Sequence, residues 1–317
     1  MGMPTSLMSR EAIRETFGEY IEDFLPAPKG HVIHDRMEAG QITDDTQHTL
    51  LIADSIIQKR RVDPHDIAAR LMKWAEDMGA FESLIVGPSS LRALHRLRQG
   101  VPVEESGVTG DTNGASMRIS TVGIYGGGDL KKTVDAVADA CMPTHNTSIA
   151  IAGASAVAMV IGCAVAGDIA GSRDVDELLS RALEAAELGS SKGRAWYGAS
   201  IVKRTQRALE IVEGSTDRGT IMNELYDIVG SGVATTETVP VCLAMLKLAN
   251  GDPVDAIRLA TNLGGDCDTT ASIVGGMCGA IAGVEAFPVE WIEKLEDVND
   301  LHLEDYADKL TQVVSST

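Results

Sequence analysis

Apolar residues recur every three or four positions along most of the chain, which is the spacing of one face of an α-helix. Residues 64–78 show it clearly: Asp63 precedes them as an N-cap residue, proline occupies the first helical position, and Gly79 follows. Alternation with a period of two, the signature of a half-buried strand, is nearly absent. The same spacing predicts helices at residues 50–57, 89–98, 149–167, 176–188, 194–213, 240–250, 253–260 and 271–283.

No charged block or low-complexity linker divides the chain. We therefore expect an all-α fold, a single-domain orthogonal helical bundle spanning residues 1–317. Residues 24–43 and 99–116 are long, irregular and rich in Gly, Pro and polar side chains. Long loops in compact helical proteins often carry function, so we expect both to contribute to a site.

The apolar run at residues 149–167 is long enough to cross a membrane. It consists mostly of Ala and Gly, and no Lys, Arg, Trp or Tyr anchors flank it. We therefore predict a helix buried on all sides within the protein, and no membrane association.

The composition of the chain limits which binding partners and which cellular compartment are expected. The net charge is −19, with 46 acidic against 27 basic residues, so a nucleic-acid polymer is not an expected partner. The N-terminus lacks a basic segment followed by an apolar one, so no signal peptide is predicted. Five cysteines without CxxC spacing indicate reduced, buried thiols, and we expect a cytoplasmic protein.

Two acidic turns each lead into an apolar helix: TDDT at residues 43–46 and GGDCDTT at 264–270. Taken alone, each is explained by a helix start, since Thr and Asp cap helices and acids complement the positive helix end. Carboxylates at the mouth of a buried helix are nevertheless costly unless something compensates their charge.

Other interpretations of the second turn fit less well. An EF-hand loop would need Gly at its sixth position and an acid at its twelfth, where Ala271 and Met277 stand. A haloacid-dehalogenase phosphatase uses D-x-D-x-T after a buried strand, whereas a helical stretch precedes this turn. Cys267 is expected to be a small spacer, because carboxylate sites select hard metals.

If the two turns meet, their carboxylates need cations to stay ionised together. Carboxylate and hydroxyl oxygens suit Mg²⁺, with Mn²⁺ as an alternative. Two such ions could grip a vicinal diol and activate a water molecule.

Five fragments, in order along the chain, resemble the ADP-ribosylglycohydrolase family, the dinitrogenase-reductase-activating group. GMP at 2–4 resembles the end of the motif GDALGMP, and ITDDTQ at 42–47 resembles the first metal motif. NGASMR at 113–118 is similar to NGAAMR, and PTHNTSIAIAGA at 143–154 to the family's T-H segment. LGGDCDTTASIVGGMCGAIAG at 263–283 resembles GGDTDTIAAIAGAIAGA.

The resemblance implies an all-α enzyme that binds two Mg²⁺ ions and hydrolyses the bond at the anomeric carbon of ADP-ribosyl groups or related ribosides. The metal ligands that it implies are Thr43, Asp44, Asp45, Asp266, Asp268 and Thr269. It further implies that Asn113, Gly114 and His145 orient the substrate, with backbone N–H groups of the glycine turn on its phosphate side. Asp44, Asp45 and Asp268 are then the candidate catalytic carboxylates.

The chain departs from the family pattern at two places. It begins where the family's first helix would end, so we expect either an upstream helix in the protein or a fold that does without one. Many members also place a glutamate four residues after this glycine, where Ser6 stands. A serine is a poor general acid or base, so activity on serine-linked ADP-ribose is in doubt, and Asp111 is a candidate replacement carboxylate.

We therefore expect a Mg²⁺-dependent hydrolase of a ribosyl glycosidic bond. Its expected substrate is an ADP-ribosylated protein or a compound like ADP-ribose. Three alternatives stay open: hydrolysis of a small ribonucleoside-like N-glycoside, an ADP-ribose-binding module without turnover, and a structural helical protein whose acidic turns are only helix caps.

Overall fold

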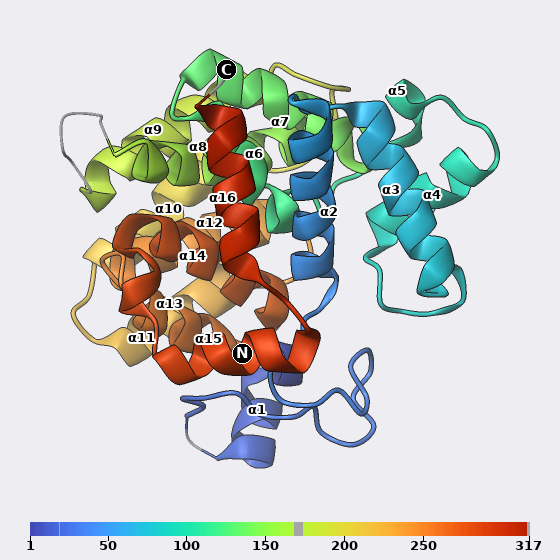
Figure 1. The fold of residues 1–317 in the computed structure, drawn as a ribbon. Helices are drawn as coiled ribbons and strands as arrows, with labels where there is room; N and C mark the ends of the chain where they lie inside the picture. Colours follow the sequence, from blue (N-terminus) through green and yellow to red (C-terminus); the bar gives the residue numbers. More distant parts are fainter. Residues whose placement is uncertain (19, 168–173, 316–317) are drawn as a thin grey trace.

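The computed structural model describes residues 1–18, 20–167 and 174–315, which fold into sixteen α-helices and several short turns (Figure 1). Within these residues there is no β-strand, only isolated bridges such as the one between Met8 and Gly265. The all-α prediction is confirmed. The helices are α1 (Arg10–Phe17), α2 (Asp44–Lys59), α3 (Pro64–Asp77), α4 (Pro88–Arg98), α5 (Val103–Ser106), α6 (Ser120–Gly126), α7 (Leu130–His145), α8 (Ser148–Ala166), α9 (Val175–Gly189), α10 (Ile201–Glu213), α11 (Arg218–Glu224), α12 (Thr235–Leu248), α13 (Pro253–Thr261), α14 (Cys267–Ala282), α15 (Val289–Asn299) and α16 (Leu303–Val314).

Helix α8 lies at the centre of the fold, in contact with α6, α7, α9, α12 and α14. Every residue of this helix from Ala150 to Ala164 is buried. By length and hydropathy the helix could span a bilayer, yet 83% of its most apolar window is buried inside the protein. Its many Ala residues let neighbouring helices approach closely, and together they form the main core.

Most predicted helices lie close to their expected bounds. The helix expected at 194–213 instead begins at Ile201, because Ser200 caps it by accepting a hydrogen bond from the Lys203 N–H. The helix expected at 50–57 begins earlier, at Asp44, so both aspartates of the first acidic turn lie within its first turn. This earlier start places their carboxylates at the positive end of α2.

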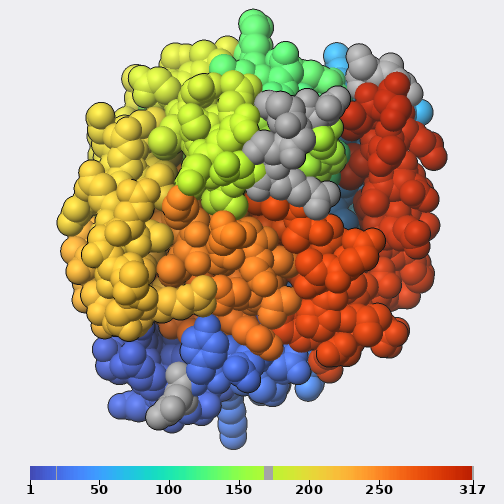
Figure 2. Space-filling view, turned by 90° about the vertical axis from the view of Figure 1, so that its left-hand side faces the viewer, coloured from blue at the N-terminus to red at the C-terminus, as the bar shows by residue number. Residues whose placement is uncertain are grey.

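The N-terminal residues form one end of the molecule, next to α13–α15 (Figure 2). A 3₁₀ turn, η1 (Met3–Thr5), packs against α14. The segment is then fixed to the loop before α14, because the Leu7 N–H donates to the Gly265 carbonyl at 2.6 Å. The loop 20–43 continues at the same end, and both segments therefore reach the second acidic turn.

Candidate metal centre

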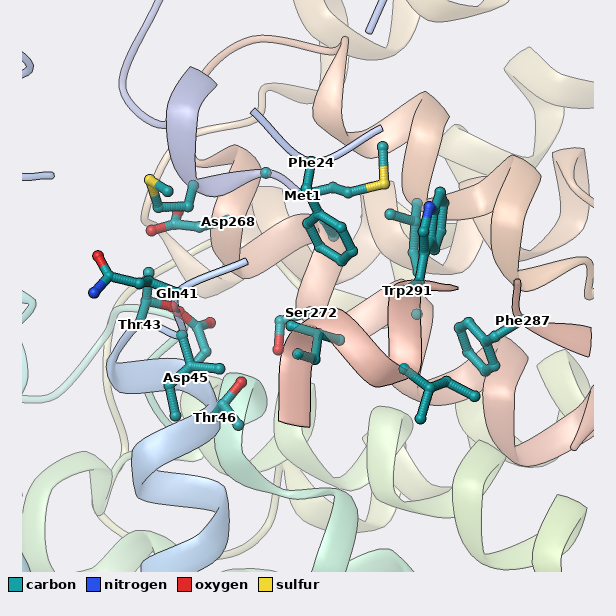
Figure 3. A pocket seen from close by; sticks show the side chains of 18 residues that line it. Met1, Phe24, Gln41, Thr43, Asp45, Thr46, Asp268, Ser272, Phe287 and Trp291 are labelled. Atoms are coloured by element: carbon teal, nitrogen blue, oxygen red, sulfur yellow. Dashed lines mark hydrogen bonds between the residues drawn. The ribbon is translucent and has the colours of Figure 1, made fainter. Parts of the chain in front are cut away.

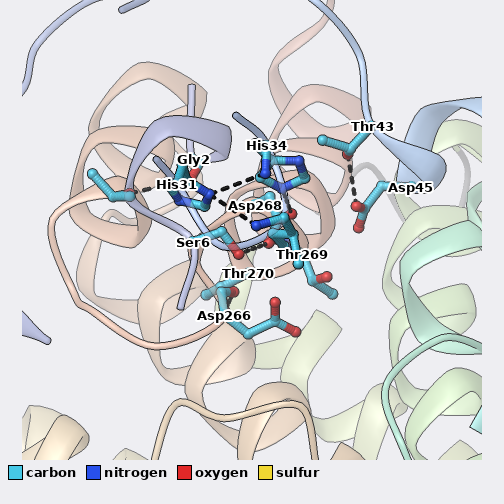
Figure 4. Close-up of polar contacts among 12 residues, drawn as sticks. Gly2, Ser6, His31, His34, Thr43, Asp45, Asp266, Asp268, Thr269 and Thr270 are labelled. Atoms are coloured by element: carbon cyan, nitrogen blue, oxygen red, sulfur yellow. Dashed lines mark hydrogen bonds and ion pairs between the residues drawn. The ribbon is translucent and has the colours of Figure 1, made fainter. Parts of the chain in front are cut away.

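The two acidic turns, one at the N-terminus of α2 and one at the N-terminus of α14, lie opposite each other (Figure 4). Thr43 is the N-cap of α2, and its hydroxyl donates to Asp45 Oδ2 at 2.8 Å. Asp266 is the N-cap residue of α14, and Asp268 lies in the first turn of that helix. Segments that are more than two hundred positions apart in the sequence thus bring their carboxylates to one place.

Neighbouring groups fix the second turn. The Asn113 side-chain amide donates to Asp266 Oδ2 at 2.5 Å and to the Thr238 hydroxyl at 2.9 Å. The backbone N–H of Thr269 donates to Asp268 Oδ1 at 3.0 Å. The predicted residue Asn113 therefore lies in direct contact with a predicted metal ligand.

Both oxygens of Asp268 also have side-chain partners from the N-terminal part of the chain. The Ser6 hydroxyl donates to Oδ1 at 2.6 Å, and His34 Nε2 lies 2.8 Å from Oδ2 (Figure 4). His31 supports His34 from behind, since its Nδ1 accepts the His34 backbone N–H at 3.1 Å. All three residues are buried.

The shared location changes the acidity of the four carboxyls. Burial, and then the charges of Asp268 and Asp266, raise the pKa of Asp44 to about 8. Burial and the charge of Asp268 also raise the pKa of Asp45 and that of Asp266 well above their usual range. Burial opposes ionisation of Asp268 too, but hydrogen bonds from His34 and Ser6 outweigh it and lower its pKa.

This donor set fits hard divalent cations. Asp45 Oδ1 is buried and has no hydrogen-bond partner, so one carboxylate oxygen is left for a ligand that the protein itself does not supply. Among the described residues, no three His, Cys, Asp or Glu side chains already stand where they could coordinate one ion. Binding would therefore draw the aspartates together, and oxygen donors from both turns would favour Mg²⁺ or Mn²⁺.

Cys267 does not belong to the donor set. Its side chain is fully buried in a small apolar cluster with Ile13 and Ile21, and burial raises the pKa of the thiol to about 12. It is a spacer, as the sequence predicts. The other four cysteines are likewise free and buried.

Two cavities adjoin the centre and share Asp268. One, of about 240 Å³, is bounded by Thr43, Asp45 and Asp268 and is otherwise lined largely by apolar residues, among them Phe24, Phe287 and Trp291 (Figure 3). We call it the Trp291 cavity. The other, of about 310 Å³, is lined by Asp44, Asp266, Asp268, Thr269, Asn113 and Gly114 and by apolar side chains. We call it the Asn113 cavity.

His145 lies behind the Asn113 turn and lines neither cavity. Its ring nitrogens pair with the hydroxyls of Thr112 and Thr144 at 3.1 and 2.8 Å. A Cβ added at Gly114 would lie 2.9 Å from His145 Cε1, so Gly114 is small because this ring packs against it. Burial, and then Arg118, lower the pKa of His145 well below its usual value, so the ring is neutral. His145 thus supports the turn from outside the lining of both cavities.

Asp111 lies at the surface side of the same turn. Its Oδ1 accepts from the Ser89 hydroxyl at 3.1 Å and is 3.5 Å from the Arg92 guanidinium. It lines neither cavity. The structure therefore does not bring Asp111 to the other candidate catalytic carboxylates.

Sequence reasoning missed His31 and His34, which contact the centre from an irregular loop. The only signal for them was the expectation that residues 24–43 form part of a site. Ser6 stood out because it replaces a glutamate, but its bond to Asp268 depends on the fold bringing residues 2–8 to the second turn.

The sequence model of the ADP-ribosylglycohydrolase family matches residues 1–317. The chain belongs to this family. It is 36% identical to the uncharacterized protein YegU of Escherichia coli K12, covering 98% of this chain and 92% of YegU. It is 26% identical to the ADP-ribosylarginine hydrolase Tri1 of Pseudomonas putida, covering 90% of this chain and 71% of that protein. Human ADP-ribosylhydrolase ARH3 is 25% identical over 87% of this chain and 80% of its own length.

A solved structure described as an ADP-ribosylglycohydrolase-related protein complex superposes with a TM-score of 0.63 at 23% identity. The match covers 94% of this chain and 87% of that one, and it confirms the fold. The family comprises ADP-ribosyl hydrolases, and its members typically use metal ions.

Proposed function

We propose that this protein is a hydrolase of a glycosidic bond at a ribose anomeric carbon, dependent on two divalent ions, Mg²⁺ or Mn²⁺. The observation that carries the proposal is the meeting of two acidic helix starts, with Asp45 Oδ1 left without a partner. Isolated helix caps would not be expected to converge in this way. Membership of a family of ADP-ribosyl hydrolases supports the same reaction class.

In this proposal Thr43, Asp44 and Asp45 hold ions from one side, and Asp266, Asp268 and Thr269 from the other. The bound ions would supply a grip on the 2′- and 3′-hydroxyls of the ribose and a lowered pKa for a water molecule. The chain's own residues orient the carboxylates: Asn113 holds Asp266, and Ser6 and His34 hold Asp268. This preorganisation keeps the donors in place as charge develops at the anomeric carbon.

A hydrolysis screen tests the proposal. The protein with Mg²⁺ is incubated with ADP-ribosylated arginine, ADP-ribosylated serine, ADP-ribose derivatives and simple nucleosides, and ribose-bearing products are quantified. We expect cleavage of at least one compound that stops when metal is chelated. Asp268→Ala should abolish both turnover and metal binding, and retention of both would contradict the proposal.

A binding module without turnover is the alternative, and one observation favours it. Ser6 occupies the place of the family's glutamate, and its buried hydroxyl donates to Asp268, so it offers no carboxylate for proton transfer. Calorimetric binding of ADP-ribose with Mg²⁺, together with no cleavage across the screen, would support this alternative. We propose a cytoplasmic setting in either case, supported by five free cysteines.

A further inference from the structure

The Asn113 cavity has a lining that does not match an ADP-ribosyl group. Among the described residues, no Lys, Arg, His, Phe, Tyr or Trp side chain lines it. A diphosphate needs cationic or N–H donors, and a purine ring is usually held by stacking or by edge hydrogen bonds. Besides the acidic turns, the polar side chains of the cavity are those of Ser83, Ser90, Thr112 and Asn113.

The backbone N–H of Asn113 is not free to replace the missing cations. The Asn113 N–H already donates to the Val233 carbonyl at 2.9 Å. Neither Asn113 nor Gly114 has a positive φ, so the turn lacks the alternating conformation that forms an anion-binding nest. The turn therefore does not offer phosphate a nest of backbone N–H groups.

Nearby guanidinium groups are engaged elsewhere. Arg92 donates to the Ser89 hydroxyl and the Thr109 carbonyl, and lies 3.5 Å from Asp111. Arg118 is buried beneath the turn and donates to the Thr144 hydroxyl. The Trp291 cavity likewise has no Lys, Arg or His side chain among the described residues that line it. Among the described lining residues, neither cavity therefore offers a diphosphate a Lys, Arg or His side chain.

The rim of the Asn113 cavity is instead apolar. Leu84, Val32 and Leu7 remain 68%, 67% and 47% exposed, and they come from three separate segments of the chain. Exposed apolar side chains that converge on one concave site indicate an apolar ligand surface. The cavity volume of about 310 Å³ is also near the lower end of ligand sites, which favours a compact molecule.

We propose that the site takes a small, unphosphorylated ribosyl compound whose aglycone is apolar, in preference to an ADP-ribosyl group. The inference rests on the proposed function, because it assumes that the ribose hydroxyls face the acidic turns. In this arrangement the ribose lies between Asp44 and Asp268, and the aglycone contacts the rim formed by Leu7, Val32 and Leu84.

Binding decides the inference independently of turnover. Isothermal titration with Mg²⁺ present compares both anomers of benzyl ribofuranoside with the same anomers carrying a 5′-phosphate, and with ADP-ribose. We expect the better unphosphorylated anomer to bind about tenfold more tightly than either phosphorylated ligand. Equal or tighter binding of ADP-ribose or of the 5′-phosphates would overturn the inference, whether or not any ligand is cleaved.

A matched pair of variants tests whether the aglycone contacts this rim. Leu84→Arg places a cation on the rim, and it should weaken benzyl ribofuranoside binding about tenfold while improving 5′-phosphate binding. Val289→Arg, at a position that is 63% exposed and outside both cavities, should change neither. Unchanged affinities in Leu84→Arg would overturn the assignment of the aglycone to this rim.

The hydrolysis screen is scored separately with 4-nitrophenyl ribofuranosides and ADP-ribosylated arginine. Absence of cleavage of every compound would contradict the proposed function. The relative affinities of the unphosphorylated and phosphorylated ligands would still test the inference independently. Cleavage of ADP-ribosylated arginine with a higher kcat/KM than any riboside would leave the proposed function intact and overturn the inference.

Discussion

Ser6 donates a hydrogen bond of 2.6 Å to Asp268 Oδ1 across 262 positions of sequence. The bond is fully buried, and with His34 on Oδ2 it fixes the orientation of a candidate metal ligand. A residue that contacts a metal-ligating side chain affects the metal by orienting that side chain. Removing such a residue is therefore expected to lower the metal affinity first.

Ser6→Ala should weaken Mg²⁺ binding about tenfold, because Asp268 loses a partner that orients it. Titration calorimetry with Mg²⁺ and Mn²⁺ measures the change, and thermal unfolding checks that the fold is retained. Ser191→Ala, in an exposed turn, is the control. Unaltered metal affinity in Ser6→Ala would show that the bond does not position the ligand.

Asp45→Asn should distinguish the effect of this carboxyl group on folding stability from its role in metal binding. Without metal the variant should unfold at a higher temperature than the wild type, because it removes a buried carboxyl whose ionisation is opposed by burial and by Asp268. With Mg²⁺ the wild type should be stabilised and the variant should not. Differential scanning fluorimetry with and without Mg²⁺ measures both shifts.

Asp77→Asn is the control for that experiment, because Asp77 is an exposed partner of Lys73 on α3. It should respond to Mg²⁺ as the wild type does. A Mg²⁺ shift that persists in Asp45→Asn would remove Asp45 from the metal site.

The stability of the metal-free protein should fall as pH rises from about 4 to about 8. The pKa of Asp44 is raised from 3.8 to about 8, so in this window the folded state binds a proton that the unfolded state has released. Each such carboxyl contributes at most about 1.4 kcal/mol per pH unit. Asp268 acts in the opposite sense, but only below its ordinary value of 3.8, because its pKa is lowered.

Urea unfolding at a series of pH values in the presence of EDTA measures this slope. Saturating Mg²⁺ should flatten or reverse it, because bound cations keep the carboxylates ionised and compete with protons. A metal-free stability that increases steadily from pH 4 to 8 would contradict the shared location of these groups.

Gly265→Ala should unfold the second turn. Gly265 has φ of +81°, and an added Cβ would lie 2.3 Å from the Ser231 carbonyl oxygen. We expect a loss of more than about 2 kcal/mol in unfolding free energy and loss of Mg²⁺ binding. Urea unfolding and calorimetry measure the two effects.

Gly276→Ala, inside helix α14 that follows this turn, is the matched control. No atom lies within 4 Å of a Cβ added there, and the backbone is helical. This variant should gain about 0.5–1 kcal/mol in unfolding free energy, because alanine favours the helix. Equal effects of the two substitutions would contradict the assigned role of Gly265.

Helical periodicity and N-caps were enough to predict the fold class and the position of most helices. Asp63 with Pro64, and Asp252 with Pro253, mark helix starts through contacts within a few residues. Such contacts do not depend on the rest of the fold, and both helices begin where these residues predict. The helix expected from residue 194 was too long because its polar and aromatic start, which includes Trp196, also fits a loop. Hydrophobic periodicity cannot distinguish a helix from a loop at the start of this segment.

The acidic turns were predictable because each carries a dense set of oxygen donors within a few residues. The hydrogen bonds of His34 and Ser6 were not, because they depend on how residues 2–8 and the loop 20–43 fold onto α14. No spacing along the chain encodes those contacts. The orientation of His145 was unpredictable for the same reason, since its packing on Gly114 is tertiary.

The acidic turns stand at the N-termini of α2 and α14, beside a core that is built around α8. The positive ends of both helices face the carboxylates, and protonation relieves the remaining charge. The newly made polypeptide can therefore reach its folded shape before it meets any cation. Under the proposed function, the cellular supply of magnesium or manganese would then set activity without governing how much folded protein accumulates.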